Sequence, residues 1–404
     1  MKKIIIILFC IVFFLATKDL LPTEVYLDIS RGFAKKIPVT LSISGDKDKK
    51  TEEILVSDLQ RSGLFSPLIN DDENEAELLI KLNCSLKLGL FRLEGIVRNI
   101  TTGSGFVFGK RYQGKYPLMR NIIHRFTNDL VKKITGEKGI ALTKICFISD
   151  ESGAKEVYLV DYDGQNKKRV TSDKIIAACP DWSEDGKNLV YLSYLNNRTE
   201  IFFHNIKSNI RKILCSYPGL NAFAAISKRG EIALTLSKDG DPEIYVMQKN
   251  GSHLRRLTYS KGIDASPSWA PDGKKIAFVS DRSGSPQIYI LDLSTKKVRR
   301  ITYQGSYNTS PAWAPEGNLI AYTSKREGCF EICIINPDNG EFKAITSGPG
   351  SKEDPSWAPN GRQLVFSKKL SYKSNLYILD ICTEKSYPLI TGKGNYISPA
   401  WSPK

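Results

Sequence analysis

A short motif that recurs at a nearly constant interval through the second half of the chain constrains the fold most. Five copies read Pro-x-Trp, and a degenerate sixth copy places an isoleucine in the same register. The key positions are Trp182, Ile226, Trp269, Trp313, Trp357 and Trp401. Successive positions lie 43 or 44 residues apart. Repeats of about 40–50 residues that each hold several short strands are typical of β-propellers.

Each repeat is predicted to form one four-stranded blade. In the repeat that begins at residue 310, the strands are expected at 310–313, 319–324, 330–335 and 342–346. Gly317 and Gly340 mark the turns after the first and third strands. Blades pack face to face, so the recurring large side chain is expected to plug the blade core rather than to bind a ligand.

The two ends of the repeat region are expected to complete one another. Residues 144–171 carry the pattern of strands two to four but lack an inner strand. The chain stops just after residues 398–402, which carry an inner strand alone. Pairing them gives six blades and removes two exposed sheet edges. The prediction is an all-β six-bladed propeller closed by the C-terminal strand.

The residues before the repeats predict a small α/β domain in which a sheet is covered by two helices. Strands are expected at 37–43, 76–83, 86–98 and 105–112. Thr51 is expected to cap a first helix that ends at Gly63, and a second helix is expected at 117–135. His124 lies off the apolar stripe of that second helix, which indicates a surface or interdomain residue.

The N-terminus has the pattern of an export signal. Lys2 and Lys3 precede an apolar run over residues 4–16, which is too short to cross a bilayer comfortably. An uncleaved anchor is the alternative. The expected organisation is a signal peptide at 1–23, a flexible segment at 24–36, the α/β domain at 37–139 and the propeller at 140–404.

Composition and motifs argue against an enzyme or a nucleic-acid-binding protein. The net charge is +15, but the lysines are dispersed and no dense basic run interleaves with aromatic residues. No Gly-x-Ser-x-Gly occurs, and the three histidines are far apart in sequence. No catalytic residue, metal ligand or cofactor is therefore expected. Seven of the eight cysteines lie outside the signal, an odd number that argues against a fully paired disulfide framework.

The connections from strand four to the next inner strand are expected to meet at one mouth of the propeller channel. Several of their residues are apolar, which favours a protein partner there. The alternative is that they pack among themselves and plug the channel. The candidate partner-binding residues are Leu220, Asn221, Phe223, Ile263, Asp264, Ala265, Asn308, Thr309, Glu353 and Asp354.

These features together resemble the TolB family along essentially the whole chain. The motifs that carry the resemblance are residues 24–29, 58–65 and 124–139, the Pro-x-Trp repeats and the terminal Pro399-Ala400-Trp401-Ser402-Pro403. The chain departs from the family in its second blade, which lacks the Pro and Trp, and in residues 220–223, which lack an expected histidine.

The resemblance implies a periplasmic, monomeric scaffold of the Tol-Pal system that supports outer-membrane integrity and cell division. The propeller mouth would bind a Pal-like lipoprotein, and the protein would be peripheral to the membrane through its partners. A TolA-like protein would bind the N-terminal strand, Glu24, Val25, Tyr26, Leu27 and Asp28. The alternative is the propeller module of a peptidase-like or carbohydrate-binding protein.

Overall fold

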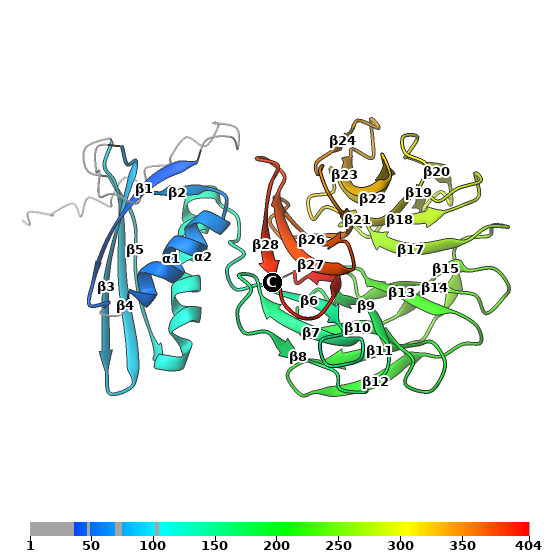
Figure 1. Ribbon diagram of the computed structural model, residues 1–404, viewed down its shortest axis with the longest axis horizontal. Helices are drawn as coiled ribbons and strands as arrows, with labels where there is room; N and C mark the ends of the chain where they lie inside the picture. The colour runs from blue at the N-terminus through cyan, green and yellow to red at the C-terminus, as the bar shows by residue number, and fades with distance from the viewer. Residues whose placement is uncertain (1–35, 47–48, 69–74, 102–104, 404) are drawn as a thin grey trace, which may run out of the picture.

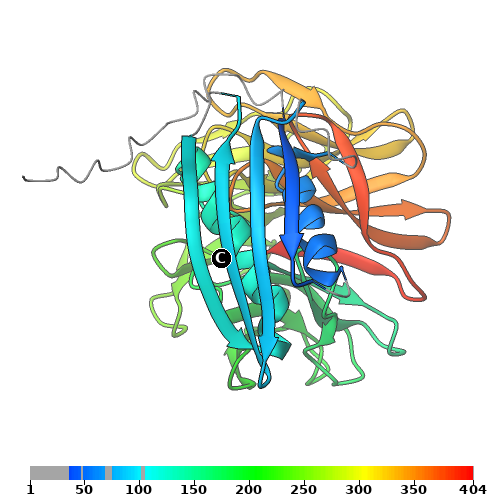
Figure 2. The same ribbon diagram turned by 90° about the vertical axis from the view of Figure 1, so that its left-hand side faces the viewer.

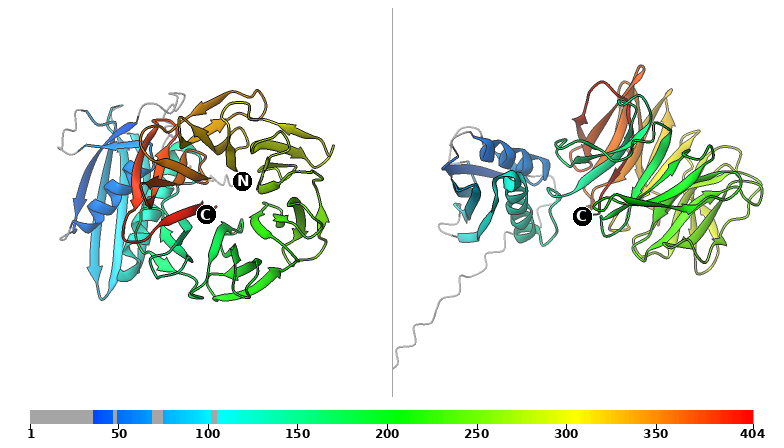
Figure 3. Two further views of the ribbon diagram at one scale, coloured as in Figure 1. Left: turned by 45° about the vertical axis from the view of Figure 1, so that its right-hand side comes forward. Right: turned by 90° about the horizontal axis from the view of Figure 1, so that it is seen from below.

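The structure, a computed structural model, describes residues 36–46, 49–68, 75–101 and 105–403. It contains a small α/β domain beside a ring of six β-sheets, which confirms the predicted fold class (Figures 1 and 3). The predicted signal peptide and the predicted partner strand, residues 24–28, lie outside the described residues. No helix in the described ranges is long and apolar enough to span a membrane.

The first domain is a five-stranded sheet with helices on one face. Its elements are β1 (Ile37–Ser44), α1 (Lys50–Arg61), β2 (Phe65–Pro67), β3 (Leu78–Lys87), β4 (Leu90–Asn99), β5 (Gly105–Lys115), η1 (Tyr116–Leu118) and α2 (Met119–Thr135). The strand order is β2-β1-β3-β4-β5, with β1 parallel to β2 and β3 and the other pairs antiparallel. Both helices lie on the side that faces the propeller, so the other face of the sheet points outward (Figures 1 and 2).

Local chemistry explains where these helices begin, end and pack. Gly136 has a φ of 78° and ends α2 in the left-handed conformation, so the helix stops at Thr135, the predicted end. The prediction that Thr51 caps α1 is wrong, because the cap position is Lys49 and Thr51 is buried within the first turn. A Cβ on Gly95 would lie 2.3 Å from the Phe126 ring, so this glycine lets α2 pack closely on the sheet.

The remaining chain forms six antiparallel four-stranded sheets, one for each blade. The first three are β9–β12 (Ala177–Trp182, Asn188–Ser193, Glu200–Asn205, Ile210–Cys215), β13–β16 (Asn221–Ile226, Glu231–Leu236, Glu243–Gln248, Arg255–Arg256) and β17–β20 (Asp264–Trp269, Lys275–Ser280, Gln287–Asp292, Val298–Arg300). The next two are β21–β24 (Asn308–Trp313, Ile320–Arg326, Cys329–Ile335, Phe342–Ala344) and β25–β28 (Ser351–Trp357, Gln363–Leu370, Lys373–Asp380, Lys385–Ile390). The inner strands are therefore β9, β13, β17, β21, β25 and the last strand of the chain.

The sixth blade joins the two ends of the propeller sequence. Its strands are β29 (Tyr396–Trp401), β6 (Lys144–Ser149), β7 (Glu156–Asp161) and β8 (Lys168–Arg169). Trp401 lies opposite Ile145, and Tyr396 lies opposite Ser149. The C-terminal strand thus supplies the inner edge of a sheet that begins some 250 residues earlier, which confirms the predicted closure (Figure 3).

Candidate functional site

The six inner strands share one backbone irregularity near the channel mouth. Each has a register shift against strand two, and the residue at that shift has a positive φ of 47–55°. These residues are Cys179, Phe223, Ser266, Ser310, Asp354 and Ser398. All six line a cavity of about 1070 Å³ that runs along the propeller axis to helix α2. The bulge turns one side chain from each blade toward the channel, so the identities in this ring set the chemistry of the mouth.

The tryptophans predicted as blade plugs also bond neighbouring blades to one another. The indole nitrogens of three of them donate to a carbonyl oxygen of the preceding inner strand: Trp182 to Ala400 at 3.0 Å, Trp269 to Ala225 at 3.1 Å and Trp357 to Ala312 at 2.9 Å. Trp401 donates to Thr143 Oγ1 at 2.8 Å. Trp313 is different, because its indole bonds Gly317 in its own turn and the side chain is half-buried.

A second kind of link fills the junctions that lack an indole bond to the preceding strand. The backbone N–H of Trp313 donates to Ser268 Oγ at 2.9 Å, and that of Trp401 donates to Ser356 Oγ at 3.0 Å. The N–H of Ile226 lies 3.4 Å from Asp181 Oδ2. The two kinds of link alternate around the ring. This alternation explains why Ile226 can replace a tryptophan: its junction uses the backbone and not an indole.

Burial shifts the pKa of three titratable groups on the inner strands. Burial raises the pKa of Asp181 to about 6, and the N–H groups of Trp182 and Ile226 oppose that shift only in part. Burial, followed by the charge of Asp354, raises the pKa of Glu353. Burial also raises the pKa of the Cys179 thiol to about 12, so this channel thiol stays protonated at neutral pH.

Three of the predicted mouth residues are buried, and they bond residues of their own blade or of the blade and connection that precede it. Asn221, Asp264 and Asn308 are 0% exposed. Asp264 accepts from Arg282 Nη2 at 2.6 Å, and Asn308 Nδ2 donates to Gln287 Oε1 at 2.7 Å. These three side chains hold the mouth connections in place, so a partner has no access to them.

Sequence reasoning missed the buried polar residues that anchor the same connections. The first residue of strand three bonds a threonine that follows strand four, as in Glu243 with Thr258 at 2.6 Å and Gln287 with Thr302 at 2.8 Å. The sequence contains a signal for these residues, because polar side chains recur there every 43 or 44 residues. They are Glu156, Glu200, Glu243, Gln287, Glu331 and Asn375. Lys352 replaces the mouth asparagine in one blade and pairs with Glu331 at 2.8 Å.

The other predicted mouth residues remain accessible. Ile263 is 49% exposed and Phe223 is 36% exposed, while Leu220, Ala265, Thr309, Glu353 and Asp354 are half-buried. Asp354 accepts hydrogen bonds from Ser310 at 2.8 Å and from Ser398 at 3.2 Å, and these bonds tie three neighbouring blades together. The accessible mouth therefore combines apolar side chains with a carboxylate at the channel rim.

Exposed apolar side chains gather at this end of the propeller. The connections between strands four and one and between strands two and three leave each blade at the same end, since neighbouring strands are antiparallel. Of the eighteen large apolar side chains exposed in the described ranges, nine lie in these connections or within three strand residues of them: Ile176, Tyr194, Phe223, Tyr259, Ile263, Tyr303, Tyr307, Leu370 and Tyr372. An apolar surface of this kind marks a protein-binding face.

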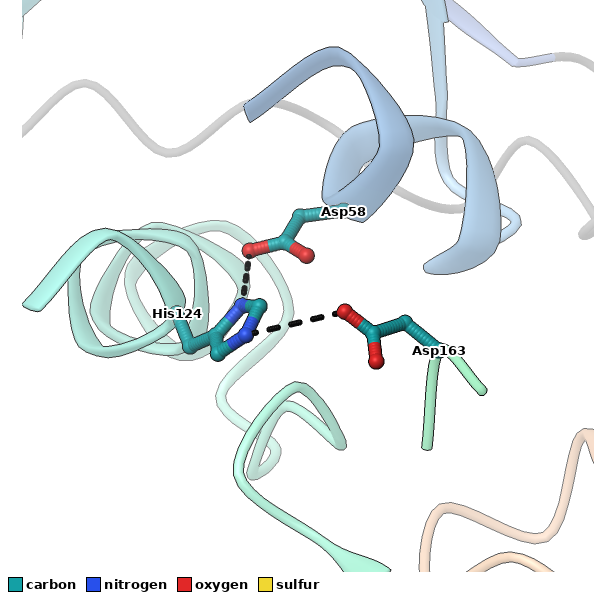
Figure 4. A group of neighbouring side chains, drawn as sticks. All are labelled: Asp58, His124 and Asp163. Atoms are coloured by element: carbon teal, nitrogen blue, oxygen red, sulfur yellow. Dashed lines mark hydrogen bonds and ion pairs between the residues drawn. The ribbon is translucent and has the colours of Figure 1, made fainter. Parts of the chain in front are cut away.

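A buried polar cluster joins the first domain to the propeller. His124 on α2 lies with its Nδ1 atom 2.7 Å from Asp58 Oδ2 on α1, and its Nε2 atom faces Asp163 Oδ2 of the sixth blade at 3.8 Å (Figure 4). All three side chains are at most 6% exposed. Of the two placements that the sequence left open for His124, the structure shows the interdomain one.

The neighbours of this cluster decide what it does chemically. Its three residues are of metal-ligating types, and their ligand atoms lie within 4.8 Å of one another. However, Tyr162 and Thr127 donate to the Asp58 carboxylate, and the Arg120 guanidinium binds Asp163. Burial, followed by the charge of Asp58, raises the pKa of Tyr162 well above its usual value, so the phenol remains a donor. The cluster therefore works as an interdomain hydrogen-bond network. The Arg120 guanidinium supplies the positive charge that a metal ion would otherwise supply.

A second contact supports the same interface. Gln363 Nε2 donates to the carbonyl oxygens of Arg61 and Ser62 at the end of α1, at 3.2 and 3.3 Å. The Arg61 guanidinium also lies 5.0 Å from the centre of the Tyr387 ring. Arg362 pairs with Asp380 beside this helix end at 2.9 Å. The first domain is thus held by polar contacts to two adjacent blades.

Fold and site together define a propeller scaffold with an accessory α/β domain. Comparisons with known proteins identify its family. The family model of the TolB beta propeller domain matches residues 131–404. The chain belongs to the TolB family. It is 36% identical over 192 residues to the protein TolB homolog of Chlorobium chlorochromatii, 48% of this chain and 43% of that one. It is 36% identical over 188 residues to the Tol-Pal system protein TolB of Desulfosudis oleivorans, 46% of this chain and 42% of that one. The chain thus spans less than half the length of these relatives.

A solved structure shows the same two-domain fold. The crystal structure of TolB from Acinetobacter baumannii matches with a TM-score of 0.84 and 24% sequence identity, over 92% of this chain and 97% of that one. The match extends beyond the propeller into the first domain. The family also supports the expectation that the chain is not an enzyme.

Proposed function

We propose that the chain is a periplasmic scaffold of the Tol-Pal system that binds a Pal-like lipoprotein at the propeller mouth. The observation that carries the proposal is the gathering of nine exposed apolar side chains at one end of the propeller. Family membership supports it, and one relative bears the name Tol-Pal system protein. In this role the protein supports outer-membrane integrity and cell division, and it reaches the membrane through its partners.

The N-terminal strand would provide the second binding site. A TolA-like protein would bind Glu24, Val25, Tyr26, Leu27 and Asp28, which would add as a strand to the edge of a partner sheet. A scaffold of this kind acts as a monomer with two binding surfaces. The support for this half of the proposal is the sequence resemblance and the family.

The accessible mouth residues provide the test of lipoprotein binding. Binding of the lipid-free Pal-like protein from the same organism is measured by calorimetry with the wild type and with Ile263→Ser. We expect Ile263→Ser to weaken binding about tenfold, since interface anchors of this kind often contribute more than about 1 kcal/mol. Ile210→Ser is the matched control, because Ile210 is 70% exposed at the start of β12, at the opposite end of a blade.

Charge at the channel rim provides a second variant. Glu353→Lys changes a half-buried rim residue whose side chain accepts no side-chain hydrogen bond in the described part of the chain. Asp264 is unsuitable for charge reversal, because its ion pair with Arg282 is part of the blade. Wild-type protein that does not bind the lipoprotein, or an Ile210→Ser effect as large as that of Ile263→Ser, would contradict the proposal.

A further inference from the structure

The first domain has exposed apolar side chains at the turn between β3 and β4, and lysines flank them. Leu88 at the turn is 103% exposed, and Leu86, Leu118 and Tyr116 are 54%, 49% and 38% exposed. We call these four residues, with Lys87 and Lys115, the domain-1 tip. Both views of the domain show the β3–β4 turn at the lower end of the sheet, with no other element over it (Figures 1 and 2).

Strand register brings the members of the domain-1 tip together. Lys87 pairs with Leu90, and Leu90 pairs with Lys115, so the two lysines flank one leucine on the outer face. The backbone N–H of Tyr116 donates to the Gly89 carbonyl at 2.9 Å, which places the tyrosine beside the turn. A Cβ on Gly114 would lie 3.9 Å from Leu118 Cβ, so Leu118 covers the other face of the same end.

Folding of the domain does not explain the leucine at the turn. Leu88 has a φ of 51°, a left-handed conformation that favours glycine or asparagine over leucine. Because its side chain is fully exposed, Leu88 gains no core packing that would offset this backbone strain. A leucine that is both unfavourable for the backbone and completely solvated is expected where another surface covers it.

The charge around the tip is positive, which indicates that the surface it binds is anionic. Strands β3, β4 and β5 carry seven lysines and arginines and one acidic residue, Glu94. Glu94 already pairs with Arg111 at 2.7 Å. Within the described ranges, neither Lys87 nor Lys115 has a carboxylate within ion-pair distance. An apolar tip flanked by unpaired cations is the pattern by which peripheral proteins enter an anionic lipid interface.

We propose that the domain-1 tip binds directly to an anionic phospholipid surface, with Leu88 entering the interface and the lysines contacting phosphates. The convex shape favours a membrane over a protein partner, because a protruding turn buries little area on a flat protein face but can enter a lipid headgroup layer. The inference is independent of lipoprotein binding, which uses the propeller mouth.

Vesicle flotation tests the proposal with protein that lacks residues 1–23, because the apolar run in that segment would bind lipid by itself. Vesicles of phosphatidylcholine alone are compared with vesicles that contain phosphatidylglycerol. We expect binding to the anionic vesicles that weakens with salt. Leu88→Asp is expected to lower the bound-to-free ratio about tenfold, since the burial of one leucine is lost. Lys87→Glu with Lys115→Glu is expected to abolish the preference for phosphatidylglycerol.

Matched variants and a lipid-free measurement complete the design. Ile210→Asp repeats the apolar-to-acid change on the propeller, and Lys296→Glu with Lys297→Glu repeats the charge change at an exposed propeller turn. Both controls should bind vesicles as the wild type does. The proposal is overturned if the wild type binds neither vesicle, if the controls lose binding equally, or if Leu88→Asp instead abolishes a dimer in lipid-free sedimentation.

Discussion

Replacing single tryptophans by alanine should reveal the alternating links between blades. Trp357 is 6% exposed, packs in a blade core and bonds the preceding inner strand through its indole. Trp357→Ala removes both contributions, so we expect it to lower the free energy of unfolding by about 3–5 kcal/mol. Trp313 is half-buried, and its junction is held by its backbone N–H, which alanine retains. Trp313→Ala should therefore cost about 1–2 kcal/mol.

The assay is urea unfolding followed by far-ultraviolet circular dichroism, which does not depend on the fluorescence of the residue that is removed. Trp357→Phe separates the two contributions, because it keeps most of the buried area and loses only the indole donor. That variant should cost about 1–3 kcal/mol, since the Ala312 carbonyl loses a buried partner. Equal destabilisation by Trp357→Ala and Trp313→Ala would refute the idea that only some tryptophans link blades.

Three further changes test the channel, the interface and the closure. Because the folded-state pKa of Asp181, about 6, lies above the usual value of 3.8, ionisation weakens the fold as pH rises through 4–6, by up to about 3 kcal/mol. Asp181→Asn should thus raise the melting temperature at pH 8 and change it little at pH 4; a shift that is equal at both pH values would contradict this cause. Tyr162→Phe leaves the buried Asp58 carboxylate without one donor, so it should cost about 1.5–3 kcal/mol and increase hydrogen exchange in α1, with unchanged exchange as the contrary result. Deletion of residues 396–404 should open the ring and sharply lower the melting temperature, whereas an unchanged melt would contradict closure by β29.

The sequence predicted the propeller well because its signals are local and repeated. One blade contains its own turns, strand alternation and core residue, so a fixed interval of 43 or 44 residues was enough to count the blades. Closure by the last strand followed from the missing pieces at each end. The short strand β2 was missed, because three residues carry no readable alternation and β2 forms only by pairing with β1.

The candidate site was harder to predict, because burial at the mouth depends on partners from other strands. Asp264 looks like an exposed loop acid in the sequence, yet Arg282 from the connection between β18 and β19 pairs with it and Asp264 is buried. The polar residues that begin an inner strand are buried and hold the mouth connections in place. The side chains that face the channel belong to the bulge two residues later. A register shift cannot be read from composition, since no distinctive residue type marks it: the bulge carries cysteine, phenylalanine, serine or aspartate.

The domain interface shows the same limit most clearly. Asp58, His124 and Asp163 come from three separate elements, and no spacing rule connects them. Because Asp58 accepts from both domains, through His124 on one side and Tyr162 on the other, its carboxylate couples the two helices to the sixth blade. That blade is also the one closed by the C-terminal strand, and Trp401 bonds Thr143 in the segment that connects the domains. Ring closure and domain docking therefore share one blade, so a change that loosens β29 should weaken both.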